Sequence, residues 1–579
     1  MSGEEFLPPP LNGVQGWDLT LIEWWMMPSG LSQMEPLVYS WLTPPEGCNI
    51  FPWLDEIADE LLWEGMHTLN ADQRKMYLWF WQGQFMHNPP MANLYYPRFY
   101  EVIADWVGGW DAVVRFRDIS HLTLNNTMLA EIRPDRDPNT LIYAVSEPLW
   151  GMNPLFVETC TEEWMCTLWF DTLYDLSIEP WPPTGQEPAP WDFYSKPALA
   201  AAPPVFMDGP NGPNTRARIL LRDNTYWSNG VKLNATDVKF TLDLILNPAA
   251  KAVAHGKLSH VVESVEIVNE TCADLILCAP HYADLMTLLS DNWGSAILPY
   301  HFLKDIPVDG LRAHPSNTAF GDPSAWMPVS GPYKPLEIVP DDQVTFEKNN
   351  DYYGYGLGWG PYNCSTLILD WIPDAAVRML ALQTNDVDFG EYPTAPVEVF
   401  QDMMNQTKWP HLRVWQYDSP VSNPVLFNFN NPYLSNRYVR QAIAHAIPYS
   451  QIISHVLPSG GIDAAYRGKA LVTPLHYYTD PSNVTVHLFN EDLQPYEYNI
   501  SKAQMYMNMW KYSQVGSDYT LGPIGDADFS GLVDLDDFYI WRGWLGTYPD
   551  DWKYLPGQDV DPDFDNNGYV ELADFYRWV

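Results

Sequence analysis

The sequence contains no long apolar run and few basic residues. No stretch of about eighteen or more apolar residues occurs, so no segment is predicted to span a membrane. The first ten residues, MSGEEFLPPP, have neither a basic nor an apolar region, and we do not expect them to act as a signal peptide. Lys and Arg number 31 against 73 Asp and Glu, which gives a formal net charge of −42. Such an acidic chain repels phosphate, which argues against nucleic acid or anionic membranes as partners.

Cysteine is also scarce, and its spacing excludes the common cysteine-based sites. The chain has six cysteines, and no group of them has the spacing of a zinc site. Cys272 and Cys278 lie in a predicted strand, about 20 Å apart when extended. Cys160 and Cys166 are about 9 Å apart along a predicted helix. Both separations are too long for a disulfide, so we expect isolated and mostly buried thiols.

The motifs of the common hydrolases are absent as well. The sequence contains no Gly-x-Ser-x-Gly, no His-Glu-x-x-His and no phosphate-binding glycine loop. Glycoside hydrolysis needs two carboxylates about 5 to 10 Å apart, and no spacing in this acidic chain singles out such a pair. These absences count against an enzyme, and a glycosidase stays a less favoured alternative.

The chain does contain enough apolar material for a large folded core. Its 579 residues are 46% hydrophobic and 15% aromatic, which excludes a disordered chain. Residues 219–248 show a clear local pattern: an apolar run, a turn at Ser228-Asn229-Gly230, and apolar residues at helical spacing. This pattern predicts a strand, a turn and a helix, with Thr236 as the N-cap of the helix.

Several motifs occur in the order that one known family shows. Residues 222–241 read RDNTYWSNGVKLNATDVKFT, and SGPY at 330–333 is followed by FEKNNDYYG at 346–354. LFNFN at 426–430 then precedes VRQAIA at 439–444. This series resembles the family 5 extracellular solute-binding proteins, the peptide- and oligosaccharide-binding components of ABC importers. The resemblance implies an α/β fold of the two-lobed, type II periplasmic-binding-protein-like class.

The order of the larger segments departs from that family. Residues 1–138, with GWDLTL at 16–21, resemble the C-terminal part of the family fold. Residues 139–515, which begin with TLIYAV at 140–145, resemble its N-terminal and central parts. Two explanations stay open: a circular permutation of one lobed domain, or a window cut from a tandem array. We expect residues 1–138 to fold back and complete the lobes that begin at Asn139.

Residues 522–579 carry a repeated acidic loop. Segments 526–537 and 563–574 each place oxygen-bearing side chains at positions 1, 3, 5, 9 and 12, with Gly at position 6. A hard cation takes about six to eight oxygens, one of them from the backbone carbonyl at position 7. The repeat resembles a type I dockerin, a small all-α module with paired EF-type calcium loops that docks on cohesins, although a metal-free acidic surface is the alternative. The implied calcium ligands are Asp526, Asp528, Ser530, Leu532, Asp534 and Asp537 in the first loop, and Asp563, Asp565, Asn567, Tyr569, Glu571 and Asp574 in the second.

Tryptophan supplies most of the candidate ligand contacts. The chain has 27 tryptophans, and an indole face can stack on a sugar ring or another large apolar group. The related family pairs a peptide's amino terminus with an acidic residue just after a "Leu-x-x-Trp" strand, but residues 24–30, WWMMPSG, contain no carboxylate. We therefore do not expect this chain to bind a peptide's amino terminus through a carboxylate at that position. The candidate ligand-binding residues are Trp24, Trp25, Trp150, Trp293, Trp326 and Asn428.

The predicted function is capture of an oligosaccharide or a peptide outside the cell for an ABC permease. The calcium module would anchor the protein or dock it on a cohesin-like partner. A cell-surface structural or adhesion role with degenerate binding lobes is the alternative, because the second lobe is short of about one strand–helix unit relative to the family.

Overall fold

The computed structural model describes most residues between 17 and 513. Within those residues, no helix is both long enough and apolar enough to cross a lipid bilayer. The described ranges are 17–22, 24–25, 34–43, 49–109, 122–177, 194–280, 282–290, 294–359, 363–390, 401–418, 421–456, 465–474, 476–479 and 485–513.

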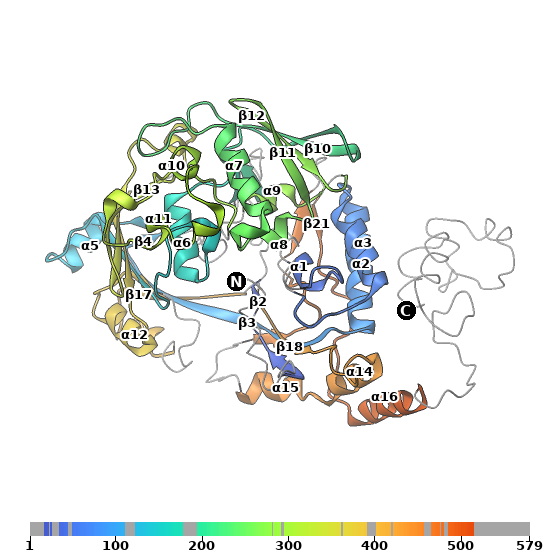
Figure 1. Ribbon diagram of the computed structural model, residues 1–579. Helices are drawn as coiled ribbons and strands as arrows, with labels where there is room; N and C mark the ends of the chain where they lie inside the picture. Colours follow the sequence, from blue (N-terminus) through green and yellow to red (C-terminus); the bar gives the residue numbers. More distant parts are fainter. Residues whose placement is uncertain are drawn as a thin grey trace.

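The largest sheet is mixed and has 11 strands (Figure 1). Three strands lie off its main path, because β17 (Leu412–Asp418) and β19 (Ala465–Arg467) pair with β3, and β2 (Trp24–Trp25) pairs with β18. The main path runs in the order β1 (Leu19–Leu21), β18 (Val421–Phe427), β3 (Met91–Ala104), β16 (Phe389–Gly390), β6 (Thr140–Val145), β15 (Thr366–Trp371), β14 (Gln343–Lys348) and β13 (Tyr333–Val339).

Strand β3 joins early and late parts of the chain. It is 14 residues long, and its successive residues pair antiparallel with β18, β19, β17 and β16. Met91 lies opposite Leu426, and Ile103 lies opposite Phe389. Strand β1 pairs with the other edge of β18. Strands β1, β2 and β3 of the first segment therefore share one sheet with strands from residues 389–467.

A second sheet of four antiparallel strands lies in the middle of the sequence. On β10, Thr215, Ala217 and Ile219 are buried and alternate with more exposed residues, as expected for a strand with one packed face. Helix α7 (Ala235–Leu246) packs against β11 and β12. The strand order is β11 (Val262–Asn269), β12 (Cys272–Leu277), β10 (Gly212–Leu220) and β9 (Val205–Gly209).

The N-cap of helix α7 lies two residues earlier than the sequence predicts. The N-cap is Asn234, not Thr236: the Asn234 side chain accepts from the Thr236 amide at 2.7 Å, and Asp237 accepts from the Asn234 amide at 2.9 Å. This reciprocal capping box satisfies two amides that the first turn leaves unpaired. The predicted strand–turn–helix order is confirmed, and the predicted cap residue is wrong.

The remaining helices cover the two sheets. Helices α2 and α3 lie at one side of the larger sheet and α14 and α16 lie below it (Figure 1). Three two-stranded ribbons complete the structure: β4 (Val107–Gly108) with β5 (Thr123–Leu124), β7 (Tyr174–Ser177) with β8 (Tyr194–Pro197), and β20 (Tyr477–Thr479) with β21 (Thr485–His487). The helices are α1 (Glu35–Val38), α2 (Glu56–Met66), α3 (Ala71–His87), α5 (Asn126–Ile132), α6 (Cys160–Trp169), α8 (His255–Leu258), α9 (Leu285–Leu288), α10 (Tyr300–Leu303), α11 (Pro315–Thr318), α12 (Ala375–Gln383), α14 (Arg437–Ala446), α15 (Tyr449–Gln451) and α16 (Ile500–Ser513).

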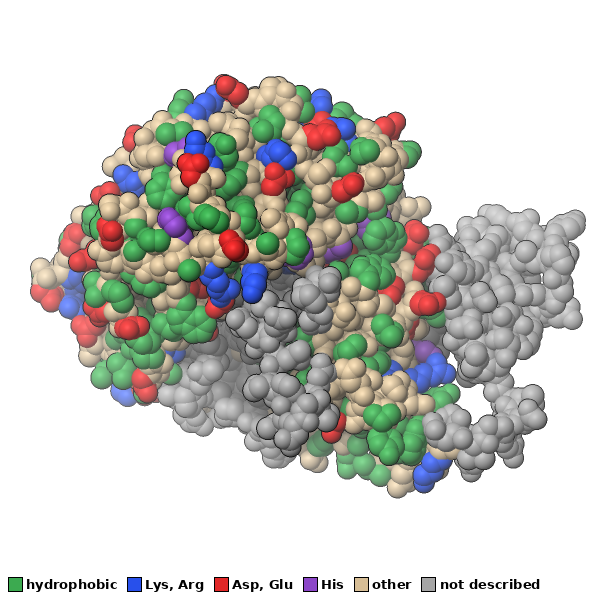
Figure 2. Space-filling view, in the orientation of Figure 1, with side chains coloured by type: hydrophobic (Ala, Val, Ile, Leu, Met, Phe, Trp, Pro, Cys, Tyr) green, Lys and Arg blue, Asp and Glu red, His purple; other side chains and the backbone are tan. Residues whose placement is uncertain are grey.

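The surface carries charged side chains of both signs (Figure 2), and the cysteines whose side chains are described are free thiols. On the face shown in Figure 2, acidic and basic side chains are interspersed over the upper part of the molecule. Among the described residues, Cys166, Cys272 and Cys364 are buried free thiols and Cys278 is an exposed one. For this part of the chain, the expectation of isolated, mostly buried thiols is confirmed, and so is the α/β class.

Candidate functional site

The loop that follows β6 is held in place by the buried carboxylate of Glu162. This residue, on α6, is 3% exposed. One of its oxygens accepts from the backbone amides of Trp150 and Gly151 at 2.8 and 2.7 Å. The other accepts from the amides of Glu158 and Thr159 at 2.7 and 3.1 Å. Burial raises the pKa of Glu162 to about 7, although the amide bonds act in the opposite direction. A single carboxylate thus ties the loop to the start of α6.

Asn317 braces the same loop from α11. Its Oδ1 accepts from the amides of Met152 and Asn153, both at 2.8 Å, and its Nδ2 donates to the carbonyl of Arg312 at 2.7 Å. A Cβ added at Gly151 would lie 2.6 Å from the Asn317 Oδ1, so this close approach requires glycine. Four consecutive backbone amides of the loop are therefore bonded to two buried side chains.

Trp150 is the exposed side chain on this braced loop. It is 59% exposed, although its own amide is bonded to Glu162. Because the backbone beneath the indole is already ordered, a ligand that stacks on it would lose little conformational entropy in doing so. The loop therefore presents a preformed aromatic surface to solvent.

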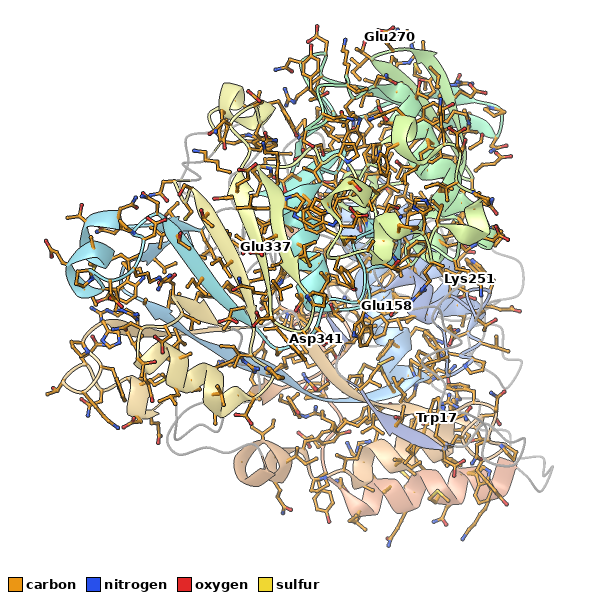
Figure 3. All side chains as sticks on the ribbon, turned by 60° about the vertical axis from the view of Figure 1, so that its left-hand side comes forward. Trp17, Glu158, Lys251, Glu270, Glu337 and Asp341 are labelled. Carbon is orange, nitrogen blue, oxygen red and sulfur yellow. The ribbon has the colours of Figure 1, made fainter. Side chains whose placement is uncertain are left out.

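A shallow hollow lies beside the loop. It is bounded by the end of β6, the turn between β13 and β14, Phe320 and Trp371. Most of its lining is apolar, and three carboxylate residues, Glu147, Asp341 and Asp342, also line it. Figure 3 shows Asp341 at the inner end of the β13–β14 hairpin. The Trp150 loop thus borders a small and mostly apolar hollow.

Trp326 lies close in the chain to the segment that braces the loop. It is half-buried, packs against the core, and donates from Nε1 to the carbonyl of Ala319 at 3.2 Å. Asn317, nine residues before Trp326, contacts the Trp150 loop, and a shared ligand site for Trp150 and Trp326 stays a prediction.

Three of the other predicted ligand residues, Trp24, Trp25 and Asn428, lie on or beside β18. Trp24 pairs with Ser422, and both the Trp24 Nε1 and the Ser422 Oγ are buried without a hydrogen-bond partner among the described residues. Asn428 is 2% exposed, donates to the Trp17 carbonyl at 2.7 Å and accepts from the Asn430 amide at 3.0 Å. These bonds give Asn428 a structural role, and its contact with a ligand stays a prediction.

Some predicted site residues cannot be placed. Trp293 and both acidic loops lie outside the described residues, and of Trp25 only the backbone is described. In the part of the chain that the structure describes, no three His, Cys, Asp or Glu side chains come together to hold a metal ion.

Sequence analysis missed the two residues that brace the loop. Glu162 had a local signal, since Thr159 and Glu162 form a capping box at the start of α6. Asn317 had none, because its partners Met152 and Asn153 are 165 and 164 residues away.

The chain matches one family model and several curated proteins. The family model for bacterial extracellular solute-binding proteins, family 5 Middle, matches residues 196–529. Proteins of Brucella ovis and Brucella abortus, each assigned as an ABC transporter peptide-binding protein, are 28% identical over 282 residues. That match covers 49% of this chain and 46% of each relative, so the chain spans about half the length of the curated relatives it matches.

Two solved structures resemble part of this chain. NikZ from Campylobacter jejuni, in complex with Ni(L-His), is 20% identical, with a TM-score of 0.45 over 64% of this chain and 63% of that one. The oligopeptide-binding protein AppA from Bacillus subtilis, in complex with a nonapeptide, is 20% identical, with a TM-score of 0.45 over 66% and 65%.

Proposed function

The chain belongs to the bacterial extracellular solute-binding proteins of family 5, and from this premise we propose that it captures a peptide outside the cytoplasm for an ABC permease. The family is one of solute-binding proteins and not of enzymes. The assignment of the Brucella relatives as peptide-binding proteins supports a peptide as the solute.

The observation that carries this proposal is the braced loop with its exposed indole. Glu162 and Asn317 fix the backbone around Trp150, whose side chain is 59% exposed. A large aromatic group held rigidly at the surface is typical of a binding contact, because it offers apolar area without a large ordering penalty. The apolar hollow next to it extends that surface.

Replacing Trp150 with alanine is expected to weaken solute binding about tenfold, or about 1.4 kcal/mol, because the stacking surface is removed. The melting temperature should not change, since the indole is mostly exposed. Isothermal titration with a panel of oligopeptides measures the affinity. Tyr226→Ala is the matched control, because Tyr226 is also an exposed aromatic residue, 54% exposed, and lies on the turn between β10 and α7. An equal affinity of Trp150→Ala and wild type would contradict the role of this loop.

An oligosaccharide is the second candidate solute. It is favoured by the exposed indole, which suits a sugar ring as well as a peptide side chain, and by the absence of a carboxylate in residues 24–30. The same titration with an oligosaccharide panel distinguishes the two solutes. The fold-back of residues 1–138 stays a prediction of the sequence, and the sheet that β1, β2 and β3 share with later strands supports it.

We further propose that residues 522–579 bind calcium and dock on a cohesin-like partner. The donor set fits the ion, because each loop offers oxygen ligands and a glycine at the sharp turn. Calcium bound there would hold the two loops in shape and would take no part in solute capture. If calcium binds but no peptide or oligosaccharide does, the adhesion role becomes the better account.

Calcium titration of three variants tests this module. Wild type is expected to bind two ions, Asp526→Ala and Asp563→Ala one each, and the double variant none, because position 1 of each loop is lost. Asp551→Ala is the control, since this residue is acidic but lies between the loops. Calcium uptake that is the same in the double variant and the control would show a non-specific acidic surface.

A further inference from the structure

The turn between β10 and α7 contains an exposed Asn-Gly pair. Asn229 and Gly230 are both exposed, and Gly230 has a φ of +81°. A Cβ added at Gly230 would meet nothing within 4 Å, so the space beside its backbone is open. Because glycine has no Cβ, its backbone nitrogen can approach the preceding side chain closely. This turn therefore exposes an amide side chain next to an unshielded backbone nitrogen.

The Asn229 side chain is held at both of its polar atoms. Its Oδ1 accepts from the Val231 amide at 3.2 Å, which places a donor at the oxygen where negative charge grows when the side-chain carbonyl is attacked. Its Nδ2 lies 2.9 Å from the Nε2 of His301 on α10. A protonated imidazole at this nitrogen can give it a proton as it leaves. The turn thus combines an attacking nitrogen, a donor to the carbonyl oxygen and a proton donor.

We propose that Asn229 is a site of self-modification, at which the side-chain amide is converted to an acid. The Gly230 nitrogen bonds to the Asn229 Cγ and closes a cyclic imide, and the Cγ–Nδ2 bond breaks. Ammonia leaves after taking a proton from His301, and the proton lost by the Gly230 nitrogen replaces it through solvent. Water then opens the imide at either carbonyl, which leaves aspartate or isoaspartate in place of Asn229. The reaction consumes water and needs no oxidant, metal or second substrate.

Another Asn-Gly pair in the described part of the chain has different amide partners. At Asn211-Gly212, a Cβ added at the glycine would also meet nothing within 4 Å. The Asn211 Nδ2, however, donates to the Leu277 carbonyl at 2.9 Å and to the Glu263 carboxylate at 2.5 Å. Neither a carbonyl nor an ionised carboxylate carries a proton for a leaving nitrogen. The same dipeptide is therefore expected to react more slowly at this position.

A hydrogen bond and the protonation of the imidazole both limit the rate. The Gly230 amide donates to the Trp227 carbonyl at 2.8 Å, and this bond has to break before the nitrogen attacks. Burial lowers the pKa of His301, so its protonated form becomes more abundant only as the pH falls. Asp237 on α7 raises this pKa, and Lys304 on α10 lowers it further. The contribution of His301 should therefore be larger at about pH 6 than at about pH 8.

Mass spectrometry of proteolytic fragments, after prolonged incubation of the full-length folded chain in buffer, tests this site. In wild type, Asn229 is expected to convert at least about tenfold faster than Asn211, with aspartate and isoaspartate both among the products. His301→Leu should slow the conversion of Asn229 about tenfold at about pH 6 and less at about pH 8, and should leave Asn211 unchanged. Incubation in urea is the control: unfolding removes the turn, so both pairs should react at similar rates in wild type and in the variant.

Two results would overturn the proposal. The first is conversion of Asn229 in the folded chain that is no faster than conversion of Asn211, a comparison that needs no variant. The second is an equal rate in wild type and His301→Leu at both pH values, because the rate would then follow from the dipeptide alone. Neither result depends on whether the protein binds a peptide, so failure of this proposal is distinct from failure of the proposed function.

Discussion

Replacing Gly331 with alanine is expected to destabilise the protein by about 3 kcal/mol or more, which is at the upper end for overpacking a core. A Cβ at this position would lie 2.4 Å from the Leu168 carbonyl oxygen and 2.8 Å from the Trp169 carbonyl carbon. Both are backbone atoms and cannot rotate away. The Gly331 amide also donates to the Trp169 carbonyl at 2.8 Å, so moving the chain would break this bond.

Urea unfolding followed by circular dichroism measures this effect. Gly83→Ala is the matched control, because Gly83 lies inside α3 and an added Cβ meets nothing within 4 Å. Alanine is the better helix former, so the control should gain about 0.5–1 kcal/mol. If Gly331→Ala unfolds at the same urea concentration as wild type, the close packing of this turn against α6 is wrong.

Replacing Asp388 with alanine is expected to cost about 3–5 kcal/mol, the range for removing one partner of a buried ion pair. Asp388 is fully buried, and Oδ1 accepts from the Arg136 Nη1 at 2.8 Å. It also accepts from the Trp106 Nε1 and from the Ile142 amide, both at 2.7 Å. The substitution would leave the Arg136 guanidinium, 9% exposed, without this carboxylate.

The control for this prediction is a solvent-exposed ion pair on the protein surface. Asp243→Ala removes the partner of Lys239 from the exposed face of α7, where the two side chains are 47% and 37% exposed. An i,i+4 pair of this kind contributes about 0.3–0.5 kcal/mol. Equal losses of unfolding free energy in Asp388→Ala and Asp243→Ala would contradict the buried role of Asp388.

The sequence predicted elements whose signal is local. Residues 219–248 show the predicted order of strand, turn and helix, because apolar spacing and turn residues lie within one short stretch. The prediction of Thr236 as the cap of α7 failed because Asn234, two residues earlier, is also a good cap. Asn317 and Asp388 could not be assigned their roles at all. Their partners are brought to them by tertiary packing, which a single sequence does not encode in its spacing.

The site was predicted less completely than the fold. Trp150 was chosen because it follows a strand, and the structure places it on an exposed loop after β6. The buried residues that make this loop rigid were not foreseen, because rigidity comes from side chains on α6 and α11. The sequence was enough to select the exposed aromatic residue, but only the structure identifies the buried residues that hold its loop in place.

The pairing of β3 has a consequence for synthesis on the ribosome. Its last residue is Ala104 and its next partner strands begin at Phe389 and Leu412, so 285 residues or more separate them (389 − 104). At about 5–20 residues per second, this strand waits roughly 15 to 60 s for those neighbours. An aromatic strand left without neighbours is prone to aggregate, and a proline and a charged residue, Pro97 and Arg98 near the middle of β3, are residue types that lower this tendency.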